Sequence, residues 1–507
     1  MGVVRNCEMD AGRKWEINNN ELNFASIIQK YNQLRPYQRV GVRFLVNNQK
    51  VLLGDDMGLG KTIQALFASV ILHKMNKANN CLIVVKKTLI QEWIDEIEKW
   101  GFEKYGINVL MIDNIPDKMN NAQFFNIITY DTLLSIFNKI KAQKPETVQK
   151  YIKAKLNFKK EWDIGIIDEA SVIKNNKTKK YVAIKNMNFK YLFLLTGTPI
   201  ENSFLDYLCL TALLNKEVEA KLIELNSFKK FKLNLSRKHK EDLFKFVISI
   251  TKHNFLRREK NSKEIMVQLP PKVSKIIRFN MSDIQKQLYL HFIENARKQN
   301  IENDTYMAKF KLLVRLQQIC VDPSLINSKI IDKNNPKLLW LKDFIEQIPQ
   351  QDKVVIFTNF IKSTELIANF IEKNCKGIKC IVYNGEKRNR DELKNLFIKD
   401  KKYRVFIATI QSASYGLNLQ VANYMVRFDD WWNPAVMKQA EDRIYRIGQN
   451  KTVFIYRLMI NNSIEIAKYD ILERKIREAN KFFKMYKKVS KELIDKLVKI
   501  ELQREVV

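Results

Sequence analysis

The sequence predicts an α/β protein made of two tandem units, each a parallel β-sheet flanked by helices. Short, continuous apolar runs recur in both halves of the chain, and most of them end in a polar or glycine-rich loop. Runs without polar alternation are typical of strands buried on both faces, as in parallel sheets. Stretches with apolar residues at helical spacing separate these runs. The 507 residues provide room for roughly three to four domains of ordinary size.

The first candidate site is the segment Val51–Thr62, VLLGDDMGLGKT. A short apolar strand leads into a glycine-rich turn, and a helix is predicted from Ile63. Free backbone N–H groups of such a loop, together with the positive end of the helix, form a cradle for phosphate. Lys61 would reach the β- and γ-phosphates of a nucleotide, and the Thr62 hydroxyl would bind Mg²⁺. Gln38, in an amphipathic helix after Pro36, could hydrogen-bond the base because an amide both donates and accepts.

The placement of glycine supports a phosphate-binding loop. Only 14 of the 507 residues are glycine, yet Gly54, Gly58 and Gly60 lie close together. This clustering indicates backbone that needs positive φ angles or close approach to another group. The motif also has glycine five positions before Gly60, where this chain has Asp55. The alternative is a glycine-rich turn that binds nothing, and the Gly-Lys-Thr sequence between strand and helix argues against it.

The second candidate site follows a buried strand predicted at Asp163–Ile167. Asp168 and Glu169 come directly after this strand. In a phosphate-loop fold, a carboxylate at this place holds Mg²⁺ and the next one orients the attacking water. The alternative is an acidic pair that caps a helix, which the phosphate-binding loop upstream makes less plausible.

Polar side chains also follow three other strands predicted in the first half. Hydroxyl and ammonium groups at strand ends are suited to hold the phosphodiester oxygens of nucleic acid. Ordinary polar residues at strand ends would give the same pattern, so each stretch alone is weak support. The residues concerned are Lys86, Lys87 and Thr88 after Cys81–Val85, Thr129 and Tyr130 after an apolar run at Ile127, and Thr196, Gly197 and Thr198 after Tyr191–Leu195.

The second half predicts another α/β unit, with strands at Val354–Phe357, Ile381–Tyr383, Arg404–Thr409 and Tyr424–Asp429. A helix is predicted from Ala435 onward, with Gln439, Arg443 and Arg446 on one face. A guanidinium group suits the task of offsetting charge on a γ-phosphate. The alternative is a set of surface arginines in salt bridges.

Charge is the strongest compositional signal. Lys and Arg number 88 against 55 Asp and Glu, which gives a net charge of +33. A surplus of this size favours a polyanionic partner, although AT-rich coding would also enrich lysine. The six cysteines are scattered, as in proteins of a reducing compartment. Cys375 and Cys380 lack a second pair or a nearby histidine, so no zinc site is expected.

Taken together, these stretches resemble the Swi/Snf-type ATPases of helicase superfamily two. Gln38 matches the glutamine motif of that family, and Asp55–Thr62 matches its first motif, which carries Asp where other phosphate loops carry Gly. Asp168–Ser171 and Thr196–Asn202 match the second and third motifs. The chain departs from the family pattern at Lys86, where the family has proline, and at Ser171, where it usually has histidine. That histidine couples hydrolysis to nucleic-acid binding in the family.

The resemblance implies two tandem RecA-like lobes with helical protrusions between them and a C-terminal brace helix. The implied lead-in is 1–32, followed by a first lobe at 33–203 and a helical protrusion at 204–255. A linker at 256–274 and a second protrusion at 275–335 precede the second lobe at 336–462 and the brace helices at 463–507. The basic protrusions would grip duplex backbone.

The function implied is ATP-dependent translocation along double-stranded DNA, with ATP and Mg²⁺ as cofactors. Thr62 and Asp168 would hold the metal, and the catalytic residues would be Lys61, Asp168, Glu169, Gln439, Arg443 and Arg446. The residues expected to contact ATP are Arg35, Gln38, Asp55, Asp56, Met57, Gly58, Leu59, Gly60, Lys61, Thr62 and Gly416. Those expected to contact nucleic acid are Lys87, Thr88, Thr129, Tyr130, Asn359, Thr409 and Trp432.

Two other functions fit the same sequence. One is a helicase that separates DNA or RNA strands, and the other is a nucleic-acid-binding scaffold whose ATPase has decayed. The intact Lys61, Asp168 and Glu169 argue against decay. The lack of a long apolar segment or a signal-peptide pattern leads us to expect no membrane association. The lack of an appended reader module and the AT-rich coding bias lead us to expect a bacterial or phage-encoded, cytoplasmic protein rather than a nuclear one. A protein partner would supply target specificity.

Overall fold

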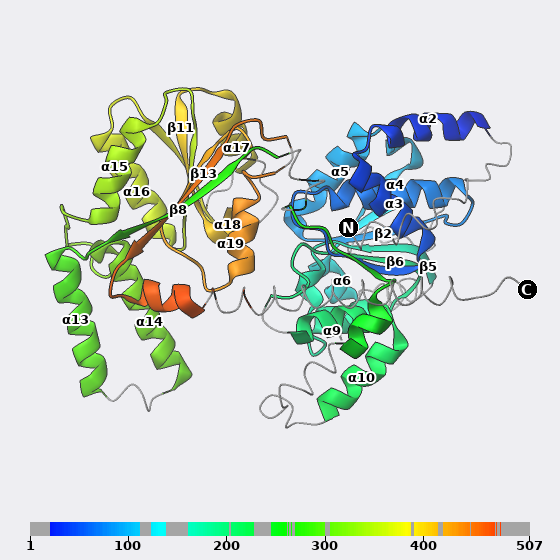
Figure 1. The fold of residues 1–507 in the computed structure, drawn as a ribbon, viewed down its shortest axis with the longest axis horizontal. Coiled ribbons are helices and arrows are strands. Elements are labelled where there is room, and N and C mark those ends of the chain that lie inside the picture. The colour runs from blue at the N-terminus through cyan, green and yellow to red at the C-terminus, as the bar shows by residue number, and fades with distance from the viewer. Residues whose placement is uncertain are drawn as a thin grey trace, which may run out of the picture. The chain divides into compact units, whose positions relative to one another are not determined.

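The computed structural model describes residues 21–111, 123–137, 161–201, 204–227, 245–260, 262, 265, 269–299, 305–386, 390–413, 419–446, 448–471, 473 and 477. They divide into two compact units, one formed by the described residues up to 265 together with residue 477, and the other by those within 266–476. Each unit is an open sheet with helices on both faces (Figure 1). Within the described residues, no helix combines the length and the apolar character needed to cross a membrane.

The first unit contains a seven-stranded sheet in the order β3-β4-β2-β5-β6-β1-β7, in which every pairing is parallel. Parallel pairing brings the carboxyl ends of all strands to one edge, where ligands bind in open α/β sheets. The strands are β1 (Lys50–Leu53), β2 (Cys81–Val85), β3 (Ile107–Leu110), β4 (Phe125–Thr129), β5 (Glu161–Ile167), β6 (Asn188–Leu195) and β7 (Phe255–Leu256).

Two hydrophobic cores lie on opposite faces of this sheet because successive strand residues point to opposite sides. Val51 and Leu53 of β1 pack in one core, and Leu52 packs in the other. The first core is covered by α2 (Glu21–Asn32), α3 (Pro36–Asn47), α4 (Lys61–Lys74) and α5 (Ile90–Lys99). The second is covered by α6 (Tyr130–Phe137), α8 (Lys179–Lys185), α9 (Phe204–Ala212) and α10 (Lys216–Ser227). Short 3₁₀ turns are η1 (Lys87–Leu89), η2 (Glu103–Tyr105) and η4 (Ala170–Ile173).

The second unit contains a six-stranded parallel sheet in the order β10-β11-β9-β12-β13-β8. The strands are β8 (Lys272–Phe279), β9 (Val354–Thr358), β10 (Lys379–Tyr383), β11 (Tyr403–Thr409), β12 (Tyr424–Arg427) and β13 (Val453–Ile460). The helices are α13 (Asp283–Lys298), α14 (Tyr306–Val321), α15 (Pro336–Gln347), α16 (Ile361–Asn374), α17 (Arg390–Lys399), α18 (Ile410–Ala413) and α19 (Pro434–Glu441), and the 3₁₀ turn η6 is Pro323–Leu325. Helices α15 and α16 pack in one core, and α17 to α19 border the other.

The structure confirms the prediction of two α/β units with parallel sheets and flanking helices. The predicted brace at 463–507 lies largely outside the described residues, of which 464–471 are helical. The prediction for the arginine-bearing helix is wrong, because α19 ends at Glu441. Beyond it the N–H groups of Arg443 and Ile444 bond three residues back, as in turns, and the Arg443 carbonyl accepts the N–H of Leu419 instead of continuing the helix.

Four strands, β3, β7, β8 and β13, lie where the sequence predicted none. β7 is only two residues long, which is too short to leave a periodic pattern. β8 lies at the edge of the second sheet, and most of its side chains are exposed or half-buried. Its lysines therefore remain in water, and the segment resembles a linker in sequence although it pairs with β13 along eight residues.

Candidate nucleotide and nucleic-acid site

The loop after β1 has the conformation that its glycines predict. Gly58 and Gly60 have φ angles of 77° and 72°, in the region that residues with a Cβ rarely adopt. Gly60 caps the N-terminus of α4, and a Cβ at this position would lie 2.5 Å from Gln38 Nε2. The loop therefore delivers Lys61 and Thr62 as the first residues of α4, where backbone N–H groups lack helical partners.

The Lys61 ammonium group lies under the loop and among carboxylates. Its Nζ donates to the carbonyls of Asp55, at 2.8 Å, and Asp56, at 3.3 Å. Burial lowers the pKa of Lys61, and the negative charges of Glu169, Asp55, Asp168 and Asp56 oppose this shift. The carboxylates at the end of β5 and the loop after β1 therefore meet at Lys61. These segments lie more than 100 positions apart in the chain, and the sequence predicted that both belong to one site.

Asp168 is held from three directions. Trp93 Nε1 donates to its Oδ2 at 2.9 Å, the Glu169 N–H donates to Oδ1 at 2.8 Å, and Tyr130 Oη donates to its backbone carbonyl at 2.7 Å. Burial and the neighbouring Glu169 charge raise the pKa of Asp168 to about 6, and the Trp93 hydrogen bond works against this rise. A carboxylate with fixed orientation and little hydration is suited to bind a cation.

Glu169 has a strained backbone and a side chain available for chemistry. Its φ of 49° and ψ of 50° place it in the left-handed region, which costs a non-glycine residue about 1 kcal/mol or more. Its buried Oε2 has no hydrogen-bond partner among the residues that the structure describes. Strain and an unsatisfied acceptor in one residue are typical of functional sites.

The residues at hand fit a nucleotide with Mg²⁺. Thr62 and Asp168 offer the hydroxyl and the carboxylate that such a cation takes, and phosphate oxygens complete its shell in phosphate-loop proteins. The described part of the chain contains no group of three His, Cys, Asp or Glu side chains that could hold a metal without such a ligand. Its cysteines, Cys81, Cys209, Cys320, Cys375 and Cys380, are free thiols.

Gln38 is buried and connects α3 to the loop. Its Oε1 accepts the N–H of Arg35 at 3.1 Å, and its Nε2 lies 3.4 Å from the carbonyl of Leu59. Tyr37 Oη donates to the same carbonyl at 3.2 Å. The structure thus brings Arg35 and Gln38 beside the phosphate-binding loop, and their contact with a nucleotide stays a prediction.

The departure at Asp55 has a structural explanation that the sequence did not reveal. Its fully buried carboxylate accepts Nε of Arg258 at 2.9 Å and the Arg258 N–H at 3.1 Å, and it forms an ion pair with the same guanidinium group. Gln64 Nε2 also donates to it, at 3.2 Å. The Asp55 side chain therefore anchors the loop to the segment that follows β7, while its carbonyl serves Lys61.

Asp56 makes a parallel set of contacts. Its carboxylate pairs with Arg257 at 3.2 Å and accepts the Lys260 N–H at 3.1 Å. Arg257 also donates to the carbonyl of Gly54 at 2.8 Å and to that of Gly197 at 3.3 Å. Met57 is buried, and a Cβ on Gly197 would lie 2.4 Å from its Cγ. We call residues 255–260 the loop clamp, because they hold the loop through these contacts.

The strand ends predicted to contact nucleic acid differ in exposure. Lys87 and Thr88 are exposed in η1, directly after β2. Thr129 is half-buried, and its Oγ1 accepts the Thr132 N–H at 3.0 Å, which caps α6. Tyr130 is buried, with its hydroxyl bonded to Asp168. This burial disfavours the predicted contact of Tyr130 with nucleic acid and assigns its side chain to Asp168.

In the second unit, one of the predicted nucleic-acid residues, Asn359, bonds the buried Asp429. The Asn359 N–H donates to Asp429 Oδ1 at 3.1 Å, and Thr358 Oγ1 donates to the same oxygen at 2.6 Å. Asn359 Nδ2 donates to the carbonyl of Asp430 at 2.6 Å. Thr409 is buried and bonds Ser412 at 2.7 Å, so its hydroxyl serves the local turn. Trp432 is half-buried, with Lys468 Nζ 4.8 Å from its ring centre.

The remaining candidates of the second unit lie around α19. Gln439 is buried in this helix, and Arg443 and Arg446 are half-buried in the turn after it. Their predicted roles stay predictions. Gly416, predicted to contact ATP, lies outside the described residues.

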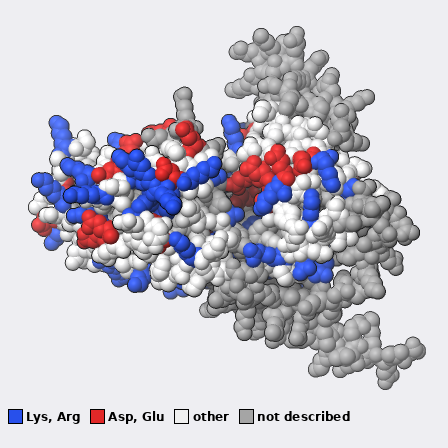
Figure 2. Space-filling view, turned by 90° about the horizontal axis from the view of Figure 1, so that it is seen from above, with Lys and Arg blue, Asp and Glu red and all other residues white. Residues whose placement is uncertain are grey.

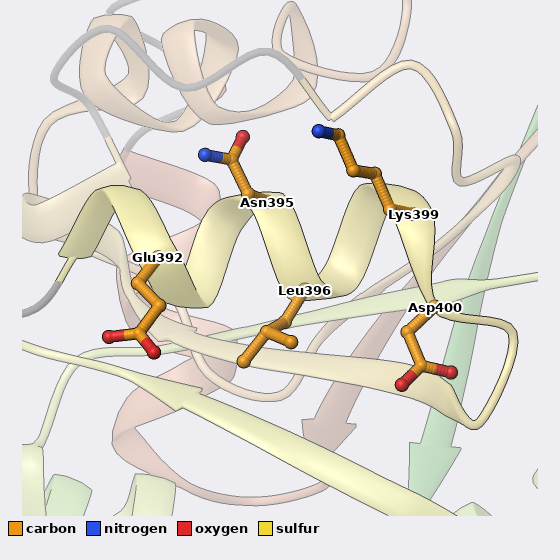
Figure 3. Close-up of a pocket in the computed structure, with 5 residues that line it drawn as sticks. All are labelled: Glu392, Asn395, Leu396, Lys399 and Asp400. Carbon is orange, nitrogen blue, oxygen red and sulfur yellow. The ribbon is translucent and has the colours of Figure 1, made fainter.

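A hollow of about 420 Å³ in the second unit lies apart from these residues (Figure 3). It is lined by Glu392, Asn395, Leu396, Lys399 and Asp400, from α17 and the residue after it. None of the predicted site residues lines it, and it is open to solvent.

Comparison with known proteins shows the family of the chain. Residues 37–325 match the SNF2-related domain, and residues 336–448 match the helicase conserved C-terminal domain. An "Uncharacterized ATP-dependent helicase" of Mycoplasma pneumoniae is 30% identical over 459 residues, which are 88% of this chain and 42% of that protein. A SWI/SNF-related regulator of chromatin from Caenorhabditis elegans is 27% identical over 520 residues, covering 88% of this chain and 51% of that protein.

This chain thus spans about half or less of the length of these curated relatives. A solved SWI2/SNF2 ATPase core from Sulfolobus solfataricus, in complex with dsDNA, is 27% identical, covers 87% of this chain and 91% of its own, and has a TM-score of 0.39. Because the SNF2-related domain alone matches more than half of the residues, the chain belongs to the SNF2-related family of helicase superfamily two.

Proposed function

We propose that this protein hydrolyses ATP to move along duplex DNA and to displace or remodel protein bound there. The observation that carries the proposal is the convergence of Lys61, Asp168 and Glu169 at the carboxyl ends of β1 and β5. These three side chains supply a cation for phosphate, a ligand for a divalent cation and a base for water. The curated relatives named as ATP-dependent helicases support the use of ATP.

In the proposed reaction, each residue of the first unit has a separate task. The N–H groups of the loop and the first turn of α4 bind phosphate, and Lys61 leaves the carbonyls of Asp55 and Asp56 to pair with it. Thr62 and Asp168 would hold Mg²⁺, which when bound would neutralise charge on the phosphates. Glu169 orients the attacking water with the carboxylate oxygen that no described group binds. The family resemblance, and no distance in the structure, is the ground for including Gln439, Arg443 and Arg446 among the proposed catalytic residues.

The nucleic-acid part of the proposal is supported by charge and exposure. The net charge of +33 favours a polyanion, and Figure 2 shows groups of Lys and Arg side chains on the described surface in view, with groups of acidic side chains among them. Exposed Lys87 and Thr88 stand at the same sheet edge as Asp168. Contacts through Lys87, Thr88, Thr129, Asn359 and Trp432 would then track one strand of the duplex.

The first test is the steady-state ATPase rate with no nucleic acid, single-stranded DNA, duplex DNA and structured RNA. Strong stimulation by duplex alone, lost in Lys61→Ala, is the expected result. Best stimulation by single strands or RNA would favour a strand-separating helicase instead. The absence of ATPase activity under every condition would contradict both and leave a nucleic-acid-binding scaffold.

Movement itself needs a separate measurement. A triplex-forming strand bound to duplex DNA is expected to be displaced when ATP is hydrolysed. The two strands of a second substrate, a duplex with an unpaired tail, are expected to stay annealed. Separation of the two duplex strands would contradict translocation without unwinding.

A further inference from the structure

We propose that Trp93 and Tyr130 transmit nucleic-acid binding to Asp168, and so couple duplex DNA to ATP hydrolysis. This inference rests on the proposed function, because it needs both a nucleic-acid contact at the ends of β2 and β4 and a catalytic role of Asp168. Trp93 and Tyr130 act as positioning residues, since both are buried and their polar atoms bond Asp168. Each of the two aromatic residues closely follows a segment that is predicted to contact nucleic acid.

The first path starts at Lys87 and Thr88. Both side chains are exposed in η1, which runs directly into α5. Trp93 lies in the first turn of α5, is 1% exposed, and its indole N–H is 2.9 Å from Asp168 Oδ2. The exposed Thr88 hydroxyl and the Trp93 N–H that orients the Asp168 carboxylate are therefore five positions apart on continuous helical backbone. A shift of η1 on binding a phosphodiester group would move this donor.

The second path starts at Thr129. Thr129 is the last residue of β4 and caps α6, whose first residue is Tyr130. The Tyr130 ring is 3% exposed, and its hydroxyl donates to the Asp168 carbonyl at 2.7 Å. Tyr130 thus holds the backbone of the same residue whose carboxylate Trp93 holds.

Both paths end at one residue whose position matters for hydrolysis. The Asp168 N–H bonds the carbonyl of Val84 in β2, the strand that leads to Lys87. The side chain of Asp168 therefore bonds α5, which follows β2, and its carbonyl bonds α6, which follows β4. Its N–H bonds β2 itself. The adjacent Glu169 also bonds Asp168 Oδ1 through its N–H, so a turn of Asp168 changes the position of both carboxylates.

The chain offers a matched pair of substitutions for the test. Trp93→Phe removes the N–H that reaches Asp168 and keeps an aromatic ring in place. Trp100→Phe removes the same group at the end of the same helix, where the indole N–H bonds Glu96 Oε1 at 2.9 Å instead. Tyr130→Phe removes only a hydroxyl and serves as the second, nearly isosteric variant.

The experiment measures the ATPase rate with and without saturating duplex DNA, together with the affinity for a fluorescent ATP analogue and for labelled duplex. We expect Trp93→Phe and Tyr130→Phe to lower the stimulation ratio about tenfold, because a hydrogen bond to a charged or buried group contributes on that scale. Affinities for both ligands should stay within about twofold of wild type, as bonds to Asp168 do not bind either ligand. Trp100→Phe should keep the wild-type ratio.

Three results would overturn the inference. In the first, duplex DNA stimulates Trp93→Phe and Tyr130→Phe as strongly as wild type. In the second, their ATPase rates fall by the same factor with and without DNA, which would show that the two residues have only a structural role. In the third, Trp100→Phe lowers the stimulation ratio by the same factor as Trp93→Phe, which would show that the packing of α5 matters and not the hydrogen bond to Asp168. A wild-type protein that hydrolyses ATP without response to any nucleic acid would contradict the proposed function itself, and so is distinct from these results.

Discussion

Glu169 illustrates at the scale of one residue how this site differs from ordinary buried structure. A left-handed backbone and an acceptor without a described partner both lower stability, and both are retained where the site needs them. The alternative considered from the sequence, an acidic pair that caps a helix, would place the Glu169 side chain at an N–H group of the helix N-terminus. Glu169 is the N-cap residue of η4, yet its side chain makes no cap hydrogen bond. The geometry therefore does not fit the capping alternative.

Replacement of Glu169 by Gln should separate binding from hydrolysis. An amide keeps the size of the side chain and cannot accept a proton, so we expect the ATPase rate to fall by about a hundredfold or more. Affinity for an ATP analogue should remain, because phosphate binding uses Lys61 and the loop. The control is Glu103→Gln at an exposed position of the same unit. An unchanged rate in Glu169→Gln would show that another group activates water.

The raised pKa of Asp168 predicts a specific dependence of stability on pH. The native pKa of about 6 exceeds the usual value of 3.8, so the native state binds more protons than the unfolded state between these values. Stability from this residue is therefore highest below pH 4 and decreases as the pH rises through 6. Asp168→Asn has no such dependence. Without nucleotide or metal, the unfolding free energy of the variant relative to wild type should rise by about 2 kcal/mol from pH 4 to pH 7.

Urea unfolding at several pH values in the presence of a chelator measures this difference. A difference that stays constant across the range would mean that Asp168 titrates with its ordinary pKa.

At the scale of elements, the loop clamp shows how a two-residue strand contributes to the site. β7 pairs with β1 at Leu52 and Leu53, and the N–H of Gly54 bonds the carbonyl of Leu256 at 2.7 Å. This pairing brings Arg257 and Arg258 to the loop, where they bond Asp56 and Asp55. The shape of the phosphate-binding loop thus depends on a segment about 200 residues away in sequence.

Removal of the Arg258 guanidinium should destabilise the first unit and weaken nucleotide binding. Arg258→Gln leaves the buried Asp55 carboxylate unpaired, which typically costs about 3–5 kcal/mol. Arg404→Gln is the matched control, because Arg404 donates to the carbonyls of Ile348 and Pro349 in the second unit. Thermal unfolding and ATP-analogue affinity are the measurements. Equal affinity in Arg258→Gln and wild type would show that the loop keeps its shape without the clamp.

The second unit contains a buried ion pair that joins two of its elements. Lys337, at the start of α15, is fully buried and lies 2.7 Å from Glu465, which follows β13. Lys337 also donates to the carbonyl of Phe428 at 2.9 Å, and Glu465 accepts the Ile460 N–H at 2.8 Å. Both charges are therefore hydrogen-bonded as buried charges require.

Breaking this pair from one side should cost more than removing both partners. Glu465→Gln leaves a buried ammonium group unpaired and is expected to cost about 3–5 kcal/mol of unfolding free energy. The double variant Lys337→Met with Glu465→Leu should recover most of this loss, because two apolar groups of similar volume need no hydrogen bonds. Chemical denaturation of the single and double variants tests the expectation. Additive losses would indicate that packing, and not charge, dominates at this position.

At the scale of the whole molecule, net charge governs how the protein meets its partner. A charge of +33 on 507 residues predicts association driven by release of counterions from a polyanion. If duplex binding engages about six phosphates, affinity should fall roughly a thousandfold between 50 and 200 mM salt. Fluorescence anisotropy with labelled duplex measures the slope. A slope near zero would contradict a phosphate-dominated interface.

The sequence by itself determined the two α/β units, the phosphate-binding loop and the Asp168-Glu169 pair at a strand end. These features depend on local patterns: apolar runs such as Cys81–Val85, clustered glycines, and polar residues directly after a strand. Only the tertiary structure decided that Asp55 pairs with Arg258, that Tyr130 and Trp93 hold Asp168, and that α19 ends before Arg443. These contacts join residues up to about 200 positions apart, and a hydrogen bond between distant side chains leaves no periodic signal in either segment.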